Sequence, residues 1–361
     1  MKRLSKKARE RQARHLKALE RRRARESRRR KCSAHIYHSS KGFKKRYGYR
    51  PPLAARVVAP EIFSIETDDS RKPVLAFLAT LRTKFADDQT KSVLIDFSRT
   101  RRFIANGTLL FYAELTRLLQ YSAGRVRVRC TNAQNARANQ VLAQIGVFSL
   151  CGHRPHGKPS LGDVVHWRVA SGHLVDNTIC APAIEAFEGK LAEPLVNGIF
   201  RGLGEAMTNA KHHAYGGVRE DGLNFRQPQQ DWWMFSQLRD GVLTVAFCDL
   251  GVGIPTTLPI KKPSIFARLL ALGKSASDAA CIAEAIEDSR TSTQLPGRGH
   301  GLGNIINVVS TIRNGVVMVM SNRGCYIMKQ EGFTTKSDYR ESILGTLIFW
   351  RVPVNGAADG T

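Results

Sequence analysis

The C-terminal half of this 361-residue chain contains three short motifs, and each one demands a particular backbone geometry. The first is Glu205-Ala-Met-Thr-Asn209, the second is Asp249-Leu-Gly-Val-Gly253, and the third is the glycine-rich run 297–303. Each is weak evidence by itself, because polar pairs on helices and glycines in turns are common. Their order and spacing together indicate one nucleotide site, so the fold has to bring the three segments together.

The first two motifs offer side-chain oxygen atoms and glycines, both of which suit contact with a nucleotide. Glu205 and Asn209 are four residues apart on an expected helix and share one face. Their oxygens suit water orientation and Mg²⁺, a cation that prefers oxygen ligands. Asp249 ends an apolar strand, where its carboxylate can accept a hydrogen bond from an adenine amino group. Gly251 and Gly253 let the backbone approach the ring, where a Cβ would collide.

The third motif opens an expected helix, 302–312, and is suited to phosphates. Backbone amides at a helix N-terminus cradle anions, and the side chains of Arg298 and His300 can add positive charge. The residues of this motif are Gly297, Arg298, Gly299, His300, Gly301, Leu302 and Gly303.

Around these motifs the hydrophobic pattern predicts helices and strands in alternation. Asp240-Gly241 between two apolar runs is a strong hairpin signal. The expected helices of this half are 183–193, 199–215, 264–288 with an interruption near Gly273, and 302–312. The expected strands are 231–238, 242–250, 316–320, 324–329 and 346–352.

The segment before these motifs predicts a second, smaller α/β body. Short strands at 92–97 and 125–129 alternate with helices at 73–85, 107–121 and 135–145. Pro73 is expected at the first helical position, where its missing N–H has no consequence. Residues 166–169 are either the last strand of this body or a bridge to the next. The chain is therefore α/β in class.

The charge is concentrated in an N-terminal arm. Residues 1–50 hold 21 Lys and Arg against three acidic residues, whereas the whole chain has a net charge of +26. The arm has too few apolar residues to bury a core, so we expect residues 2–31 to be disordered or a solvated helix. Nucleic acid is one expected partner, through counterion release. A merely solubilising tail and an acidic membrane surface are the alternatives.

The seven cysteines are dispersed without a C-x-x-C pair, and no signal peptide or transmembrane segment is recognisable. This pattern is typical of reduced thiols in a cytoplasmic protein. Two Cys/His groupings, at 32–38 and 151–156, lack a second ligand pair at zinc-finger distance, and we interpret both as loop residues.

The three motifs resemble those of the GHKL, or Bergerat-fold, ATP-binding superfamily, over residues 180–355. The N box of that family matches 205–215, its D-x-G-x-G box matches 249–254 with Ile254 at the end, and its glycine lid matches 297–303. The wording Glu-Ala-Met-Thr-Asn-Ala is most similar to the anti-sigma-factor serine kinases. The resemblance implies a two-layer α/β sandwich that binds ATP and Mg²⁺, with 255–296 as a long lid. It also implies roles for four residues: Glu205 as general base, Asn209 on Mg²⁺, Asp249 on adenine, and Thr346 near adenine.

Residues 90–150 resemble a STAS domain, the antagonist fold that partners such kinases, and an unrelated small βα domain is the alternative. The loop in which that family carries a phosphorylated serine reads Ala105-Asn106-Gly107-Thr108 here, so Thr108 is the only hydroxyl. The expected organisation is a basic arm and linker at 1–60, a STAS-like domain at 61–172 and an ATP-binding domain at 173–361.

These expectations favour three functions. The first is a protein kinase that phosphorylates Ser or Thr, on itself or on a protein partner. The second is an ATPase that acts as a regulatory switch through the STAS-like domain. The alternative is a non-catalytic ATP-bound module whose basic arm binds nucleic acid, which the presence of Glu205 argues against.

Overall fold

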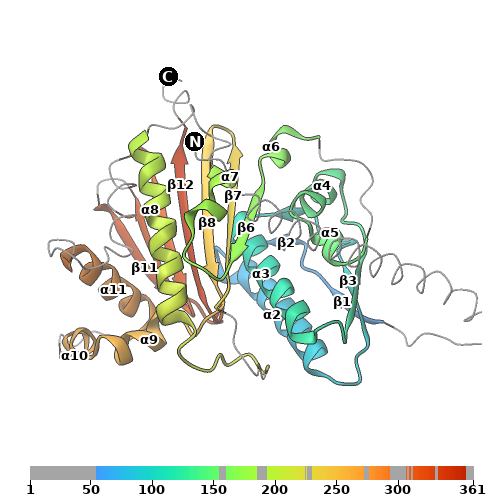
Figure 1. The fold of residues 1–361 in the computed structure, drawn as a ribbon, viewed down its shortest axis with the longest axis horizontal. Coiled ribbons are helices and arrows are strands. Elements are labelled where there is room, and N and C mark those ends of the chain that lie inside the picture. The colour runs from blue at the N-terminus through green and yellow to red at the C-terminus, as the bar shows by residue number, and fades with distance from the viewer. Residues whose placement is uncertain are drawn as a thin grey trace, which may run out of the picture. The chain divides into compact units, whose positions relative to one another are not determined.

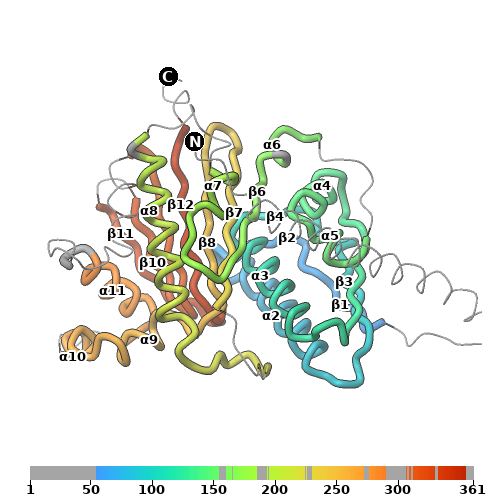
Figure 2. Tube along the Cα trace, viewed as in Figure 1, coloured from blue at the N-terminus to red at the C-terminus, as the bar shows by residue number. Residues whose placement is uncertain are grey.

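The computed structural model describes residues 54–153, 160–184, 193–223, 225, 230–271, 276–292, 306, 309, 312–329 and 332–354. The basic arm and the glycine-rich run 297–303 lie outside these residues. Residues 54–361 form one compact unit of mixed α/β structure, which Figures 1 and 2 trace from its blue N-terminal to its red C-terminal part. Within the described ranges, no helix combines the length and the apolar character needed to cross a membrane.

The N-terminal part is built on a three-stranded parallel sheet in the order β1-β3-β5, with a short parallel pair, β2-β4, beside it. Its strands are β1 (Ala55–Val58), β2 (Ile62–Phe63), β3 (Ser92–Asp96), β4 (Arg102–Phe103) and β5 (Arg127–Cys130). Its helices are α2 (Asp68–Ala86), α3 (Ala105–Ser122), α4 (Ala136–Gln144), α5 (Val147–Leu150) and α6 (Gly162–Val165).

The C-terminal part is built on a seven-stranded sheet in the order β11-β10-β9-β12-β8-β7-β6, in which every neighbouring pair is antiparallel. Its strands are β6 (Arg168–Gly172), β7 (Trp232–Arg239), β8 (Val242–Asp249), β9 (Val316–Ser321), β10 (Gly324–Lys329), β11 (Thr334–Asp338) and β12 (Thr346–Pro353). Its helices are α7 (Ala181–Ile184), α8 (Glu193–Asn209), α9 (Ile254–Lys261), α10 (Pro263–Ala271) and α11 (Asp278–Ser292), with a 3₁₀ turn η1 (Asn177–Ile179) and a π-helical turn η3 (Ala210–Ala214).

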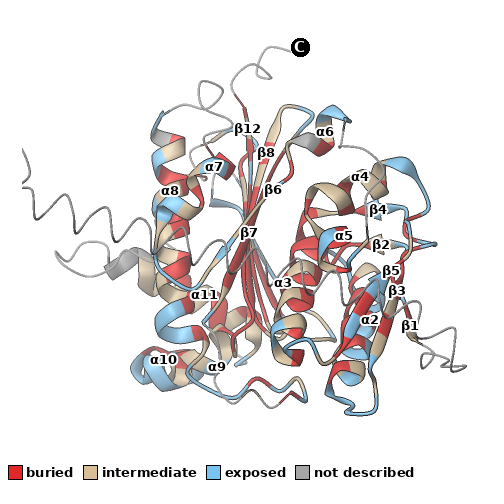
Figure 3. Ribbon diagram, turned by 45° about the vertical axis from the view of Figure 1, so that its right-hand side comes forward, coloured by how far each residue is buried: buried red, intermediate tan, exposed pale blue. Residues whose placement is uncertain are grey.

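Both faces of the seven-stranded sheet are covered. Helices α7, α8 and α11 lie on one face, where Leu203 and Met207 of α8 pack with Trp232 and Phe247 of the sheet. Helix α3 lies on the opposite face, where the rings of Tyr112 and Phe235 are 5.9 Å apart (Figure 3). The core of the N-terminal part continues into this second face. Helices of the C-terminal part thus cover one face of the sheet and the N-terminal part covers the other, which makes one layer more than the two that were expected.

Several predicted elements are present close to their expected bounds. The hairpin turn is confirmed: Asp240 and Gly241 have φ angles of 51° and 70°, as a type I′ turn requires. The helices α3 and α4 and the strands β3, β5, β8, β9, β10 and β12 also match predicted segments. Helix α8 begins at Glu193 and ends at Asn209, about six residues earlier at each end than the predicted helix 199–215. The predicted helical segment 264–288 contains α10 and α11, and its expected interruption near Gly273 lies outside the described residues. Most of the predicted helices 183–193 and 302–312 also lies outside the described residues.

The start of α2 differs from the prediction. The helix begins at Asp68, so Pro73 lies inside it and not at its first position. Thr67 caps the helix reciprocally with Ser70: the Ser70 N–H donates to Thr67 Oγ1 at 3.3 Å, and the Thr67 N–H donates to Ser70 Oγ at 3.2 Å. This capping box satisfies the N–H groups of Thr67 and Ser70, which allows the helix to begin before Pro73.

The expected boundaries also shift at both ends of the N-terminal part. Residues 55–58, expected in the linker, form β1 and pair with β3. Residues 168–172, expected at the end of the STAS-like domain, form β6 and pair with β7 of the other sheet. Strand β11 was not predicted, since Thr334–Asp338 is exposed throughout and shows no alternation.

Candidate functional site

Three strand ends and one helix meet at one edge of the seven-stranded sheet. Asp249 ends β8 and is directly opposite Thr346, which begins the neighbouring strand β12. Thr346 is in turn opposite Ser321, which ends β9. Helix α8 packs on one face of the sheet, and its last residue, Asn209, lies near these strand ends. The strand pairing and the packing of α8 together bring close residues that lie up to 137 positions apart in sequence.

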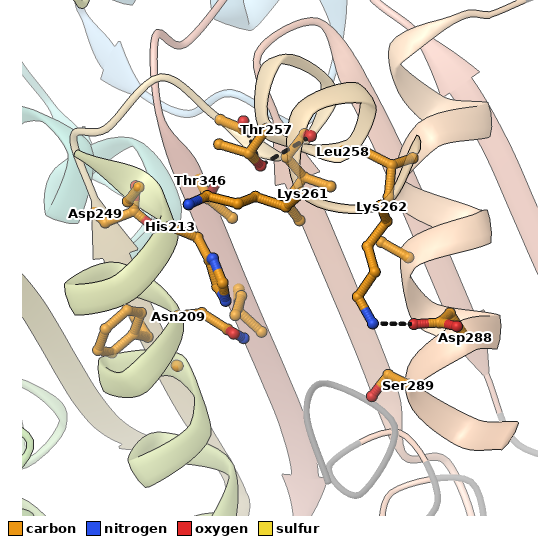
Figure 4. A pocket seen from close by; sticks show the side chains of 17 residues that line it. Asn209, His213, Asp249, Thr257, Leu258, Lys261, Lys262, Asp288, Ser289 and Thr346 are labelled. Carbon is orange, nitrogen blue, oxygen red and sulfur yellow. Dashed lines mark hydrogen bonds and ion pairs between the residues drawn. The ribbon is translucent and has the colours of Figure 1, made fainter. Parts of the chain in front are cut away.

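These residues line a cavity of about 250 Å³ (Figure 4). Five residues singled out from the sequence are part of its wall: Asn209, Asp249, Gly253, Ile254 and Thr346. Ligand pockets usually measure about 300–1,000 Å³, so the described wall encloses space close to the lower end of that range. The run 297–303, whose seven residues were also candidates, lies outside the described residues.

Asp249 is the most perturbed ionisable group of the cavity. Its side chain is buried, and this burial raises the pKa of its carboxyl to about 6. The N–H of Gly251, 3.0 Å from Oδ1, and the N–H of Thr346 oppose this rise, because both donate to the charged form. Asp249 is thus a buried hydrogen-bond acceptor that faces a cavity, which is suited to a ligand N–H donor.

The loop after Asp249 is held by hydrogen bonds from three directions. The Val252 N–H donates to Ala214 O at 2.7 Å, and the Leu250 N–H donates to Tyr215 Oη at 3.2 Å. On the far side, the Ile254 N–H donates to Ser321 Oγ at 2.8 Å. The loop is therefore fixed to η3 and to the end of β9.

The two glycines of this loop have different reasons to be glycine. Gly253 lines the cavity with a φ of 86°, and a Cβ there would lie 2.6 Å from Asn322 Nδ2. Gly251 does not line the cavity, and its Cβ would lie 2.2 Å from the carbonyl oxygen of Ala214. The sequence analysis assigned Gly251 to the approach of a ligand ring; in the structure, the missing Cβ makes room for η3.

Glu205 lies one helical turn before Asn209 on α8, and its side chain is half-buried. It is not part of the cavity wall as described. The two residues thus share a helix, as the spacing predicted, but the structure brings only Asn209 into the cavity.

The structure adds basic residues that the sequence analysis did not assign. His213 comes from η3, while Lys261 and Lys262 come from the end of α9. Figure 4 shows Lys261 extending across the cavity toward His213. Burial, followed by the positive charge of Lys261, lowers the pKa of His213. Lys262 Nζ lies 3.1 Å from Asp288 Oδ2, so of the two lysines in the described wall Lys261 is the one placed to meet an anionic ligand.

A signal for His213 was present in the sequence, because it follows Asn209 by four residues, one turn further along. Lys261 was harder to find. The helix that carries it, α9, contains Pro255 and Pro259, which read as helix breakers, and it falls in the segment expected to be a lid. A π-helical turn such as η3 occurs frequently at functional sites.

Two further expectations concern metal sites and phosphorylation. Among the residues that the structure describes, no group of three or more His, Cys, Asp or Glu side chains could hold a metal ion. Thr108 is fully buried in α3 and donates to Ile104 O at 2.6 Å, so its hydroxyl is not accessible to a kinase in this fold. Neither a scan against protein-family models nor a search of curated proteins finds a match to this chain.

Proposed function

We propose that this chain is an ATP-binding protein of the GHKL type that uses ATP as a regulatory switch through its STAS-like N-terminal part. One observation carries the proposal. Asn209, Asp249, Gly253, Ile254 and Thr346 come from three separate segments, were named from the sequence alone, and all line one cavity.

The chemistry of the cavity wall supports a purine nucleotide. The buried Asp249 provides an acceptor for the exocyclic amino group of adenine, and its raised pKa leaves most of it ionised at pH 7. Lys261 provides positive charge for phosphate groups. A guanine base has a carbonyl where adenine has its amino group, so Asp249 favours adenine.

The residues also fit Mg²⁺ as a partner of ATP. Mg²⁺ usually takes one or two protein oxygens and completes its shell with phosphates and water. Asn209 supplies one such oxygen from α8. The metal would offset the negative charge of the phosphates, while Lys261 adds to this from α9.

The reaction is a kinase or an ATPase step, in which Glu205 would accept a proton from a hydroxyl or from water. Phosphorylation of Thr108 in the N-terminal part is not proposed, because that hydroxyl is buried and already donates to Ile104 O. A Ser or Thr acceptor would belong to another part of the chain or to a protein partner.

The position of Glu205 favours a second candidate function. Since Glu205 does not line the described cavity, the chain could bind ATP without turning it over, as a module whose basic arm, residues 2–31, binds nucleic acid.

One experiment separates these functions. The purified full-length protein is incubated with Mg²⁺ and γ-labelled ATP, and free phosphate and protein-bound label are followed together. The variants Asn209→Ala and Glu205→Ala serve as comparison. Protein-bound label indicates a kinase, and free phosphate alone indicates an ATPase switch. Binding without either product supports the module, and absence of ATP binding refutes the proposal as a whole.

We expect Asn209→Ala to abolish Mg²⁺-dependent binding and Glu205→Ala to retain binding but stop turnover. Equal loss of binding in both variants would contradict the assigned roles, because it would make Glu205 a ligand and not a base.

A further inference from the structure

Two loops beside the cavity each contain a residue other than glycine with a positive φ. Asn322, between β9 and β10, has a φ of 52°, and Leu344, just before β12, has a φ of 54°. Asparagine tolerates this left-handed region, but it costs a branched side chain such as leucine about 1 kcal/mol or more. Contacts from elsewhere must therefore hold these loops in place.

Arg71 of α2 holds the first loop. Its side chain is fully buried, and burial lowers the pKa of its guanidinium. Nη2 donates to Asn322 O at 2.7 Å, Nε donates to Glu341 O at 3.0 Å, and the guanidinium lies 4.2 Å from the centre of the Tyr339 ring. Two carbonyls and a ring face thus stabilise a buried cation. They do so only while the loops keep this conformation.

Asn322 in turn donates two hydrogen bonds to segments of the cavity wall. Its side-chain Nδ2 donates to Val252 O at 2.9 Å, within the loop that joins Asp249 to α9. Its backbone N–H donates to Gly345 O at 3.0 Å, directly before Thr346. Through Asn322, Arg71 is thus linked to the segment that follows Asp249 and to the segment that precedes Thr346. Arg71 itself does not line the cavity.

Glu114 of α3 holds the second loop through Arg219. Both carboxylate oxygens of Glu114 accept from Arg219, at 3.2 and 2.8 Å, and the side chain of Glu114 has no exposed surface. Burial would raise the pKa of Glu114, but Arg219 and Arg82 outweigh it and lower the pKa to about 2. Arg219 Nε then donates to Leu344 O at 2.7 Å.

We propose that Arg71 and Glu114 are positioning residues for the nucleotide: from helices outside the cavity, they set the two loops that shape its wall and so set its affinity. This inference rests on the proposed binding of ATP. It also gives the N-terminal part a means of regulation, because any partner that shifts α2 or α3 changes affinity at the cavity. By linkage, bound nucleotide changes the affinity for that partner by the same factor.

The test is a double-mutant cycle on the full-length protein. Arg71→Met removes the buried donors, and Asn322→Gly removes the side-chain link but tolerates the positive φ. Calorimetric titration with Mg-ATP should give an affinity about fivefold or more weaker for each single variant. The double variant should be no weaker than the weaker single variant, because both changes interrupt one path.

The matched control is Lys72→Met, which replaces the neighbouring, exposed cation on the same helix and should bind like the wild type. Arg71→Lys retains the charge but not the paired donors, and it takes the place of Arg71→Met if that variant does not fold. Wild-type affinity in the Arg71 variants refutes the inference. The inference is also refuted if the fold-losses of affinity in the two single variants multiply in the double variant, because that result would indicate independent effects.

Hydrogen exchange without nucleotide separates failure of this inference from failure of the proposed function. The peptide that covers residues 249–258 should exchange faster in Arg71→Met than in Lys72→Met. If the wild type does not bind Mg-ATP, the proposed function fails, and this difference in exchange would still support control of the loop by Arg71. Equal exchange rates would refute that control whether or not ATP binds.

Discussion

Replacing Asp249 by asparagine tests the site through two properties that should change in opposite directions. Asp249 is buried, and its carboxyl has a pKa raised from 3.8 to about 6. In the unfolded chain the carboxyl titrates near its ordinary value. Between about pH 4 and pH 6 the folded protein therefore retains a proton that the unfolded chain has released.

The sign and the size of the effect follow from this difference. The folded state binds more protons in that window, so the free energy of unfolding falls as pH rises through it. A shift of about two units corresponds to about 3 kcal/mol, which is the cost of burying the charge at neutral pH. Asparagine carries no charge and avoids this cost at every pH.

A second effect opposes the gain. Two backbone donors, from Gly251 and Thr346, face the carboxyl group. The asparagine amide can accept from only one of them in this orientation, and a buried donor without an acceptor costs about 1–3 kcal/mol. At pH 7 we therefore expect Asp249→Asn to lie between unchanged stability and about 2 kcal/mol greater stability than the wild type.

The assay is urea unfolding of both proteins at a series of pH values from 3.5 to 7.5, read as the difference in unfolding free energy. The difference cancels the contribution of other groups, such as Glu114, whose stabilising effect is lost as the pH falls from about 4.5 to about 2. Asp249→Asn should gain about 3 kcal/mol relative to the wild type between pH 4 and pH 6 and then remain level. A flat difference would refute the argument from the buried charge.

The same variant should bind ATP more weakly than the wild type. A hydrogen bond to a charged group contributes about 1.5–3 kcal/mol, so ATP affinity should fall by about 10- to 100-fold. Asp231→Asn is the control, because burial raises the pKa of Asp231 also, yet it does not line this cavity. A more stable variant with unchanged ATP affinity would remove Asp249 from the site.

Three further predictions follow from the cavity, the loop and the arm. Lys261→Ala should weaken ATP binding about fivefold and leave adenosine binding unchanged, measured by calorimetry, and an equal loss for both ligands would exclude a phosphate contact. Gly251→Ala should lower the unfolding free energy by about 1–3 kcal/mol, because its Cβ would lie 2.2 Å from a carbonyl oxygen, whereas Gly216→Ala, with its nearest atom at 3.7 Å, should not. Deleting residues 2–31 should abolish salt-sensitive binding of nucleic acid and leave ATP affinity unchanged; if that binding persists, the arm is not its source.

Local signals in the sequence were sufficient for two features whose geometry is set within a few residues. The turn at Asp240-Gly241 needs only two residues that tolerate positive φ, and both have it. The face of α8 that packs on the sheet follows from the spacing of Ile199, Leu203 and Met207 along one helix. Such patterns act within a few residues, so a single sequence reveals them.

The candidate site was also partly readable. Asn209 and Asp249 were identified from motifs, because a motif fixes how a side chain leaves its own helix or strand, and Thr346 was identified from the family resemblance. Lys261 was not identified, since prolines conceal its helix, and the contact between Gly251 and η3 was not foreseen. In both cases the deciding contact comes from another segment of the chain.

Three features were determined by the sequence alone: the α/β class, the hairpin between β7 and β8, and five of the residues that line the cavity. Only the tertiary structure decided that β6 joins the large sheet, that α3 closes its second face, and that Glu114 pairs with Arg219 across 105 positions. A buried ion pair of this kind has no local pattern, because each partner alone looks like an ordinary charged residue. Its stability exists only when the fold removes both charges from water together.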